Sequence, residues 1–218
     1  MQTLKILNSG FITHDVKRFI LEKPKGFVYR PGQSAHISIN LPGWEDKIRP
    51  FTFTSLNDWP YLEFIIKIHD DHNGVTNELG KLKLGSELLL HDVFGSIEYK
   101  GPGIFIAGGT GITPFIAIFR ALYISDNLRK TGLIYSNRTK EDIILGQELF
   151  KMLGPAYINI FTREGVIGFW ERRIDRKYLI ETIRNFDTRF YVCGPQKFTE
   201  DITKDLINLG VNPQSLIV

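Results

Sequence analysis

The chain has 218 residues, of which 43% are hydrophobic and 12% aromatic, so it can build one large or two modest cores. Its net charge of +3 comes from 27 basic and 24 acidic residues scattered along the chain, which argues against nucleic-acid and membrane-surface proteins. Cys193 is its single cysteine, which excludes an intrachain disulfide and a four-thiolate metal site, so redox chemistry would need an organic cofactor. The sequence has neither a transmembrane run of about eighteen apolar residues nor a signal peptide, and we expect a cytoplasmic protein.

The first part of the chain, residues 1–98, has the pattern of an antiparallel β-barrel or sandwich. Short runs of β-branched and aromatic residues alternate with turn signals such as Pro31-Gly32 and Pro42-Gly43. One short helix is expected in GVTNELGKL, residues 74–82, with Thr76 as its N-cap. The expected strands are LKILNS (4–9), KRFILEK (17–23), SAHISIN (34–40), YLEFIIKI (61–68) and SELLLHD (86–92).

The pattern changes in the second part, residues 103–218, and YKGPG at 99–103 is the expected boundary. Apolar strands alternate there with helical segments, which predicts an α/β domain with a parallel sheet covered by helices. The expected strands are GIFIAG (103–108), TGLIYS (131–136), AYINIF (156–161) and RFYVCG (189–194). The expected helices lie near 113–125, 141–152, 175–184 and 196–209.

A glycine-rich loop, Gly108-Gly109-Thr110-Gly111, joins the first of these strands to a helix that opens near Pro114. Backbone N–H groups at the start of a helix attract anions, and glycine lets a pyrophosphate approach them. The spacing is not G-x-G-x-x-G and the Walker lysine is absent, so the loop alone indicates a phosphate-type ligand. A tight turn without a ligand is the alternative.

Four further stretches combine glycine, basic or hydroxyl residues with the ends of strands. They are RPFTFTS (49–55), HNGVTNEL (72–79), YSNRTKEDII (135–144) and YVCGPQKF (191–198). Open α/β sheets bind ligands at the carboxyl ends of their strands, where the last two stretches are expected. With PGQ (31–33), HDVFGSI (91–97) and GGTGITP (108–114), the chain resembles the plant-type ferredoxin reductase superfamily over about residues 3–218. In that family an FAD-binding barrel is joined to a nicotinamide-nucleotide domain.

The resemblance implies a set of FAD contacts in the barrel. Arg49 would pair with the pyrophosphate, Thr52 would hydrogen-bond near the reactive flavin nitrogen, and Phe51 would lie against the isoalloxazine where the family usually has tyrosine. The other implied FAD contacts are Pro50, Lys67, Ile68, Gly74, Val75 and Thr76.

The resemblance also implies a set of nucleotide contacts in the second domain. Gly109, Thr110 and Gly111 would hold the phosphates of the nicotinamide dinucleotide, and Cys193, Gly194 and Pro195 would face the nicotinamide. Arg138 could pair with the 2′-phosphate of NADP, stack on adenine or be solvated. NADH and NADPH both stay open, with NADH slightly favoured because a second basic residue is missing: Lys140 is near Arg138, but Glu141 and Asp142 follow it directly.

The expected activity is transfer of a hydride from NAD(P)H to bound FAD, with Thr52 and Cys193 beside the reacting atoms. Electrons would then pass to flavodoxin, ferredoxin or a small-molecule acceptor. One alternative is a flavin reductase that uses free flavin as its substrate, which Phe51 in place of tyrosine suggests. Another is a binding or sensor module that holds a flavin or nucleotide without turnover.

Three further features of the sequence bear on this interpretation. HDDHNG at 69–74 resembles a metal cluster, but a polar loop explains it and no metal is expected. Cys193 has no histidine near it in sequence, so we expect a packed thiol rather than a nucleophile. The sequence ends in PQSLIV, whereas relatives usually end in a glutamate and an aromatic residue that covers the flavin, so we expect a more open flavin face.

Overall fold

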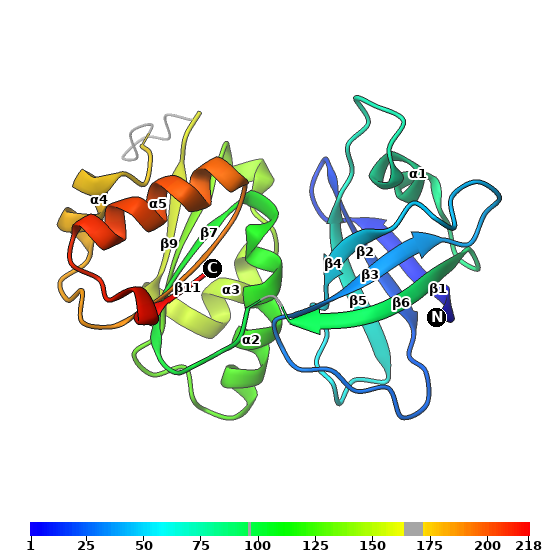
Figure 1. The fold of residues 1–218 in the computed structure, drawn as a ribbon, viewed down its shortest axis with the longest axis horizontal. Coiled ribbons are helices and arrows are strands. Elements are labelled where there is room, and N and C mark those ends of the chain that lie inside the picture. Colours follow the sequence, from blue (N-terminus) through cyan, green and yellow to red (C-terminus); the bar gives the residue numbers. More distant parts are fainter. Residues whose placement is uncertain (96, 164–171) are drawn as a thin grey trace.

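The computed structural model describes residues 1–95, 97–163 and 172–218, and it shows a barrel beside an α/β half (Figure 1). The barrel, residues 2–95, is a six-stranded antiparallel sheet in the order β4-β3-β6-β1-β2-β5. An isolated bridge between Phe53 and Phe64 joins its two edges. The strands are β1 (Gln2–Phe11), β2 (Val16–Glu22), β3 (Gln33–Ile39), β4 (Arg49–Thr52), β5 (Tyr61–Lys67) and β6 (Glu87–Gly95).

The predicted helix of the barrel is α1 (Val75–Lys81), and its N-cap is Gly74 rather than Thr76. Gly74 has extended backbone, while Thr76 lies in the first turn and its hydroxyl accepts a 3.4 Å hydrogen bond from the N–H of His69. At the other end of α1, the ammonium of Lys17 donates hydrogen bonds to the carbonyls of Gly80 (2.9 Å) and Leu82 (2.7 Å). A cation at this position satisfies carbonyl groups that the helix leaves unpaired.

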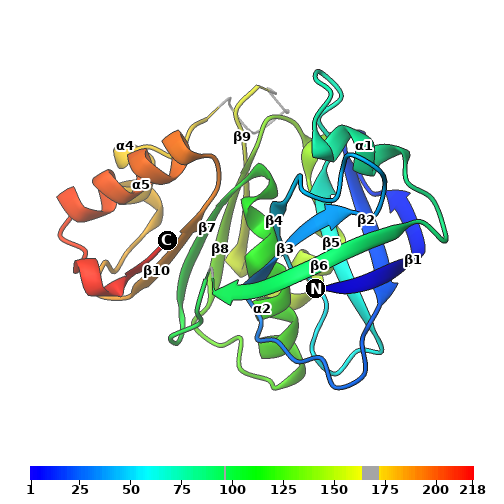
Figure 2. The same cartoon turned by 45° about the vertical axis from the view of Figure 1, so that its right-hand side comes forward.

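The α/β half, residues 103–217, contains a parallel sheet in the order β11-β10-β7-β8-β9. Its strands are β7 (Gly103–Gly108), β8 (Gly132–Asn137), β9 (Tyr157–Phe161), β10 (Arg189–Cys193) and β11 (Leu216–Ile217). Its α-helices are α2 (Thr113–Ile124), α3 (Gly146–Leu153), α4 (Arg176–Thr182) and α5 (Gln196–Asn208). Helices α2 and α3 lie between the sheet and the barrel, whereas α4 and α5 cover the far face (Figures 1 and 2).

Two local differences from the sequence prediction have clear causes. Helix α3 begins at Gly146 instead of near 141, because Lys140–Asp142 form a separate 3₁₀ turn closed by a capping box between Thr139 and Asp142. The edge strand β11 was not predicted. It is only two residues long, too short for a periodic pattern, and its parallel pairing with Phe190 and Tyr191 of β10 defines it.

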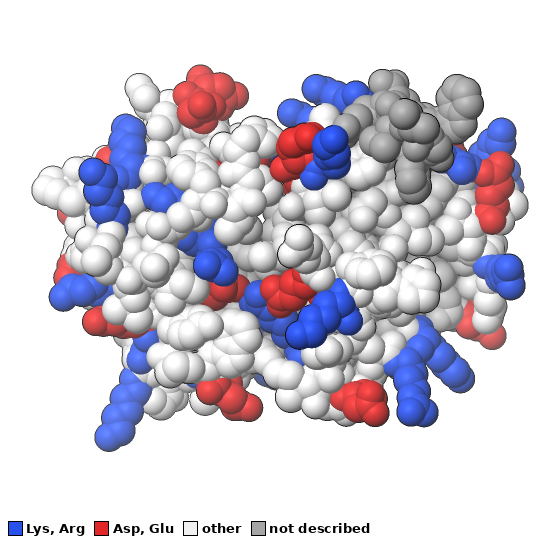
Figure 3. Space-filling view, turned by 180° about the vertical axis from the view of Figure 1, so that it is seen from behind, with Lys and Arg blue, Asp and Glu red and all other residues white. Residues whose placement is uncertain are grey.

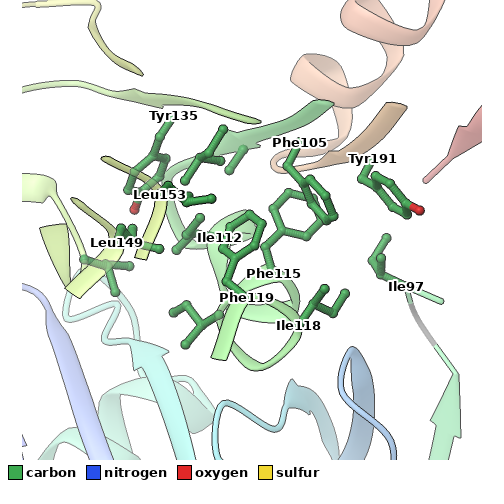
Figure 4. Packing of buried hydrophobic residues seen from close by; sticks show 14 of the residues in the cluster. Ile97, Phe105, Ile112, Phe115, Ile118, Phe119, Tyr135, Leu149, Leu153 and Tyr191 are labelled. Atoms are coloured by element: carbon green, nitrogen blue, oxygen red, sulfur yellow. The ribbon is translucent and has the colours of Figure 1, made fainter. Parts of the chain in front are cut away.

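The two parts of the molecule share a continuous apolar core. The rings of Phe105, Phe115 and Phe119 gather between β7 and α2 (Figure 4), and the ring of Tyr191 stacks on Phe105 with centroids 4.2 Å apart. Val16 and Ile65 of the barrel belong to the same buried cluster. The barrel and the sheet are therefore held in one relative orientation by packing.

In the described ranges, no helix is both long enough and apolar enough to cross a bilayer. On the face shown in Figure 3, basic and acidic side chains are interspersed. This agrees with the scattered charge of the sequence.

Candidate functional site

A cavity of about 810 Å³ opens between the barrel and the carboxyl ends of β7, β8 and β10. It brings together nine of the predicted cofactor contacts from both parts of the chain. These are Pro50, Lys67, Gly109, Thr110, Gly111, Arg138, Cys193, Gly194 and Pro195. Its other lining residues include Asp15, His69, Asn137, Asp142, Thr162 and Phe198.

The two glycines expected to hold phosphates are in different environments. Gly109 has a φ of +53°, and a Cβ added there would meet no atom within 4 Å, so its backbone is open to the cavity. A Cβ on Gly111 would lie 2.3 Å from the carbonyl oxygen of Cys193. Gly111 is therefore required for close packing of the loop against the end of β10, whether or not a phosphate binds.

Two hydroxyl groups hold the glycine loop. The Tyr135 hydroxyl donates a 3.0 Å hydrogen bond to the carbonyl of Gly109, and the Thr113 hydroxyl donates one of 3.0 Å to the carbonyl of Thr110. Burial raises the pKa of Tyr135 well above its usual value, so this hydroxyl stays protonated and remains a donor. Sequence reasoning did not select Tyr135, which reads there as one more apolar residue of a buried strand.

Asn137, the last residue of β8, has an unsatisfied amide beside the cavity. Its side chain is 4% exposed, and neither of its polar atoms makes a hydrogen bond to the described residues. The Asn137 amide lies close enough to the Tyr135 hydroxyl to oppose the rise of its pKa, but that hydroxyl donates its proton to the carbonyl of Gly109. A buried polar group without a partner costs about 1–3 kcal/mol, so Asn137 is suited to a polar ligand that enters the cavity.

Cys193 ends β10 with a half-buried thiol. Burial raises the pKa of the Cys193 thiol to about 11, although a backbone hydrogen bond from Gly194 opposes the shift. The thiol is therefore neutral near pH 7 and poorly suited to act as a nucleophile. The ring of Phe198 lies over the neighbouring glycines, 3.1 Å from a Cβ added at Gly108 and 2.6 Å from one added at Gly194.

The predicted flavin contacts of β4 lie on the barrel beside the cavity. Arg49 is exposed, and its guanidinium donates a 2.8 Å hydrogen bond to the carbonyl of Ile48. Phe51 is half-buried and packs against the barrel core, and the Thr52 hydroxyl is 3.0 Å from that of Ser34. Of the remaining predicted contacts, Ile68 also packs on this core, Val75 is buried in it, and Gly74 and Thr76 are half-buried at the start of α1.

An ion pair between Asp15 and Lys67, 2.5 Å apart, lies in the cavity wall. Burial alone would raise the pKa of the Asp15 carboxyl, but the hydrogen bond and charge of Lys67 outweigh it and hold that pKa below its usual range. His14, Asp15 and Asp142 place three possible metal-ligating atoms within 4.8 Å of one another at the same rim. In the described ranges this is the one group of three or more His, Cys, Asp or Glu side chains whose ligand atoms lie close enough together to hold a metal ion. The pair of His69 and His72 does not belong to such a group.

A second basic residue does lie beside Arg138. The N–H of Arg163, which follows β9, donates a 2.9 Å hydrogen bond to the carbonyl of Arg138, and both side chains are exposed. The expectation of NADH rested on the lack of such a residue, and parallel pairing of β8 with β9 brings one to the neighbouring strand end, so this premise does not hold and both coenzymes stay open.

Comparisons with known proteins agree with this geometry. The family model described as "Oxidoreductase NAD-binding domain" matches residues 105–204. NADH-cytochrome b5 reductase 1 of Eremothecium gossypii is 27% identical over 232 residues, which cover 96% of this chain and 79% of that protein.

Two solved structures have the same fold. The flavohem-like FAD/NAD-binding domain of a nitric oxide dioxygenase from Vibrio cholerae matches with a TM-score of 0.86 at 21% identity, over 99% of this chain and 96% of that chain. A ferredoxin NADP+ reductase from Neisseria gonorrhoeae with bound FAD and NADP matches with a TM-score of 0.82 at 20% identity, over 96% and 91%. The predicted architecture of a barrel followed by an α/β domain is confirmed, as is the predicted class of oxidoreductases. In sequence and fold the chain is therefore similar to oxidoreductases that carry FAD- and NAD-binding domains.

Proposed function

We propose that this protein is an NAD(P)H-dependent flavin oxidoreductase that holds FAD on its barrel and passes electrons to a separate carrier. The observation that carries the proposal is the cavity itself. It joins the predicted flavin side, Pro50 and Lys67, to the predicted nucleotide side, the Gly109–Gly111 loop and Cys193. The reductase from Eremothecium gossypii is an NADH enzyme by name, and the Neisseria gonorrhoeae structure contains both cofactors.

The residues present fit these cofactors. The open backbone of Gly109 leaves room for a phosphate, and the unsatisfied amide of Asn137 offers one donor and one acceptor group to a bound nucleotide. Arg49 is exposed on β4, and its always-charged guanidinium is suited to pair with a pyrophosphate. A bound flavin would supply a hydride acceptor that can release electrons to a second partner.

The chain's own contribution is binding, orientation and exclusion of water. Tyr135 and Thr113 hold the glycine loop in one conformation, and Phe198 packs behind it. The neutral thiol of Cys193 provides a half-buried wall that neither charges nor reacts at neutral pH. Such preorganised positioning is what hydride transfer between two cofactors requires of a protein.

The electron acceptor is proposed to be a small carrier protein. Flavodoxin and ferredoxin are the carriers that the sequence suggests, and the name of the Eremothecium gossypii relative adds a b-type cytochrome. Each can be tested directly by adding it to the reduced protein and recording its spectrum.

The decisive experiment is an absorbance spectrum of the purified protein before and after ultrafiltration, followed by anaerobic titration with NADH and NADPH. We expect a flavin spectrum that stays with the protein and bleaches on addition of either nucleotide. Flavin that passes freely into the filtrate yet is reduced during turnover would instead indicate a free-flavin reductase. Bound flavin that no nucleotide reduces would indicate a binding module and would overturn the proposal.

A further inference from the structure

Arg120, in the middle of α2, is a buried cation that contacts three different elements. Its side chain is 7% exposed. Nη1 donates to Glu63 Oε1 on β5 at 2.6 Å and to the carbonyl of Thr54, just beyond β4, at 2.7 Å. On its other side, Nε and Nη2 donate to the two carboxylate oxygens of Glu148 on α3, at 2.6 and 2.9 Å. One guanidinium therefore joins the α/β half to the barrel.

The barrel side of this contact is itself fixed by hydrogen bonds. The Thr54 hydroxyl donates to Glu63 Oε1 at 2.8 Å, and the N–H of Glu63 donates to the Ser55 hydroxyl at 2.9 Å. The Glu63 side chain is 3% exposed, and the ring of Trp59 covers the guanidinium with its centroid 4.9 Å from Cζ. Directional, water-shielded bonds of this kind leave the guanidinium little freedom to move.

The elements that Arg120 joins are those that carry the two sides of the cavity. Helix α2 follows directly from the Gly109–Ile112 turn that lines the nucleotide side. Thr54 follows two residues after Thr52 of the expected flavin motif, and β5 continues from Glu63 to Lys67 in the cavity wall. Arg120 itself does not line the cavity.

We propose that Arg120 is a positioning residue: through Glu63 and Thr54 it fixes the nucleotide side of the cavity relative to the flavin side, and so controls the rate of hydride transfer. The inference rests on the proposed function. Buried ion pairs often stabilise a fold no more than apolar residues of similar volume would, so their directional bonds are the distinctive contribution. Reaction rates fall steeply when two reacting groups are misplaced by a fraction of an ångström to an ångström.

The test compares isosteric variants of the two carboxylates that pair with Arg120. Glu63→Gln weakens the ion pair that crosses to the barrel, whereas Glu148→Gln weakens the ion pair within the α/β half and serves as the matched control. Arg120→Met removes both ion pairs. For each variant, rapid mixing gives the limiting rate of flavin reduction at saturating NADH and the NADH concentration at half-saturation, and ultrafiltration gives FAD retention.

We expect the limiting rate to fall about tenfold or more in Arg120→Met and a few-fold in Glu63→Gln. In both variants, the NADH concentration at half-saturation and the fraction of FAD retained should stay within about threefold of the wild-type values. Glu148→Gln should keep the wild-type limiting rate. An unchanged rate in folded Arg120→Met, or equal losses in the two glutamine variants, would overturn the proposal. If Arg120→Met does not fold, the comparison of Glu63→Gln with Glu148→Gln decides the question.

A second measurement does not depend on activity. Amide hydrogen exchange of the cofactor-free protein should become faster in Glu63→Gln both at residues 54–66 and along α2, with α5 as the unaffected internal reference. Exchange confined to one of these two segments, or uniform over the chain, would mean that the network does not couple the two sides. Wild-type protein that neither NADH nor NADPH reduces would refute the proposed function, and the exchange data would still decide whether Arg120 joins the two parts.

Discussion

The Tyr135 hydroxyl donates a 3.0 Å hydrogen bond to the Gly109 carbonyl, which ties β8 to the one glycine of the loop whose Cβ position is open to the cavity. Tyr135→Phe removes this bond without changing the ring. We expect the free energy of unfolding to fall by about 1 kcal/mol and half-saturation by NADH to rise a few-fold, because the loop is less fixed before binding. Denaturant unfolding and steady-state kinetics measure the two effects.

Tyr157→Phe is the matched control for that variant. Its hydroxyl donates a 2.8 Å hydrogen bond to Asn159 in the same sheet, on a strand that does not carry the glycine loop. The control should lose similar stability and keep the wild-type response to NADH. An equal rise of the NADH concentration at half-saturation in both variants would show that general weakening of the sheet, and not loss of the bond to Gly109, causes the change.

Substitution of Gly109 and of Gly111 by alanine should have different effects on stability and on nucleotide binding. Gly109→Ala should fold, at a cost of about 1–2 kcal/mol for a Cβ in left-handed backbone, but should bind nucleotide poorly because the new methyl group enters the cavity. Gly111→Ala should unfold at a much lower temperature, because its Cβ would overlap the Cys193 carbonyl. Thermal unfolding and flavin bleaching by NADH separate the two cases. A stable, fully active Gly109→Ala protein would remove Gly109 from the nucleotide site.

Cys193 should behave as a packed thiol rather than as a nucleophile. Its pKa is raised from 9.0 to about 11 by burial, so the folded state favours the neutral form. This contribution to the free energy of unfolding is fully present below about pH 9 and is lost as the pH rises toward 11. The stability difference between wild type and Cys193→Ser should therefore shrink over that interval. At pH 7 the serine variant should retain NADH-dependent flavin reduction within about tenfold, whereas loss of a nucleophile would abolish turnover.

Sequence patterns predicted the strands and most helices because those elements have strong periodicity or clear turn signals. The strand YLEFIIKI became β5, yet nothing in it shows that Glu63 is buried. That burial depends on Arg120, which is 57 positions away and pairs with Glu63 only in the folded chain. Long-range pairing of this kind leaves no local signal.

The sequence also predicted only those parts of the candidate site that have a local signal. Glycine loops and strand ends identified the nucleotide side, because their chemistry is local. Asn137 stands next to Arg138 in the same predicted loop but was not selected, since the lack of a hydrogen-bond partner becomes visible only when all its neighbours are placed. Arg163 was missed for a related reason, because strand pairing brings it to Arg138.

The pair of Arg138 and Arg163 gives the coenzyme preference a direct test. Two exposed guanidinium groups on adjacent strand ends suit a 2′-phosphate, which carries charge that NADH lacks. If they bind it, Arg163→Ala should lower kcat/KM for NADPH by about tenfold or more, equivalent to about 1.5–3 kcal/mol for a bond between charged groups, while kcat/KM for NADH changes less than about threefold. Arg189→Ala, a cation at the opposite end of β10, is the control. Equal losses with both coenzymes in Arg163→Ala would mean that the arginine contacts a part shared by NADH and NADPH. No loss with either coenzyme would mean that Arg163 is a solvated surface residue outside the nucleotide site.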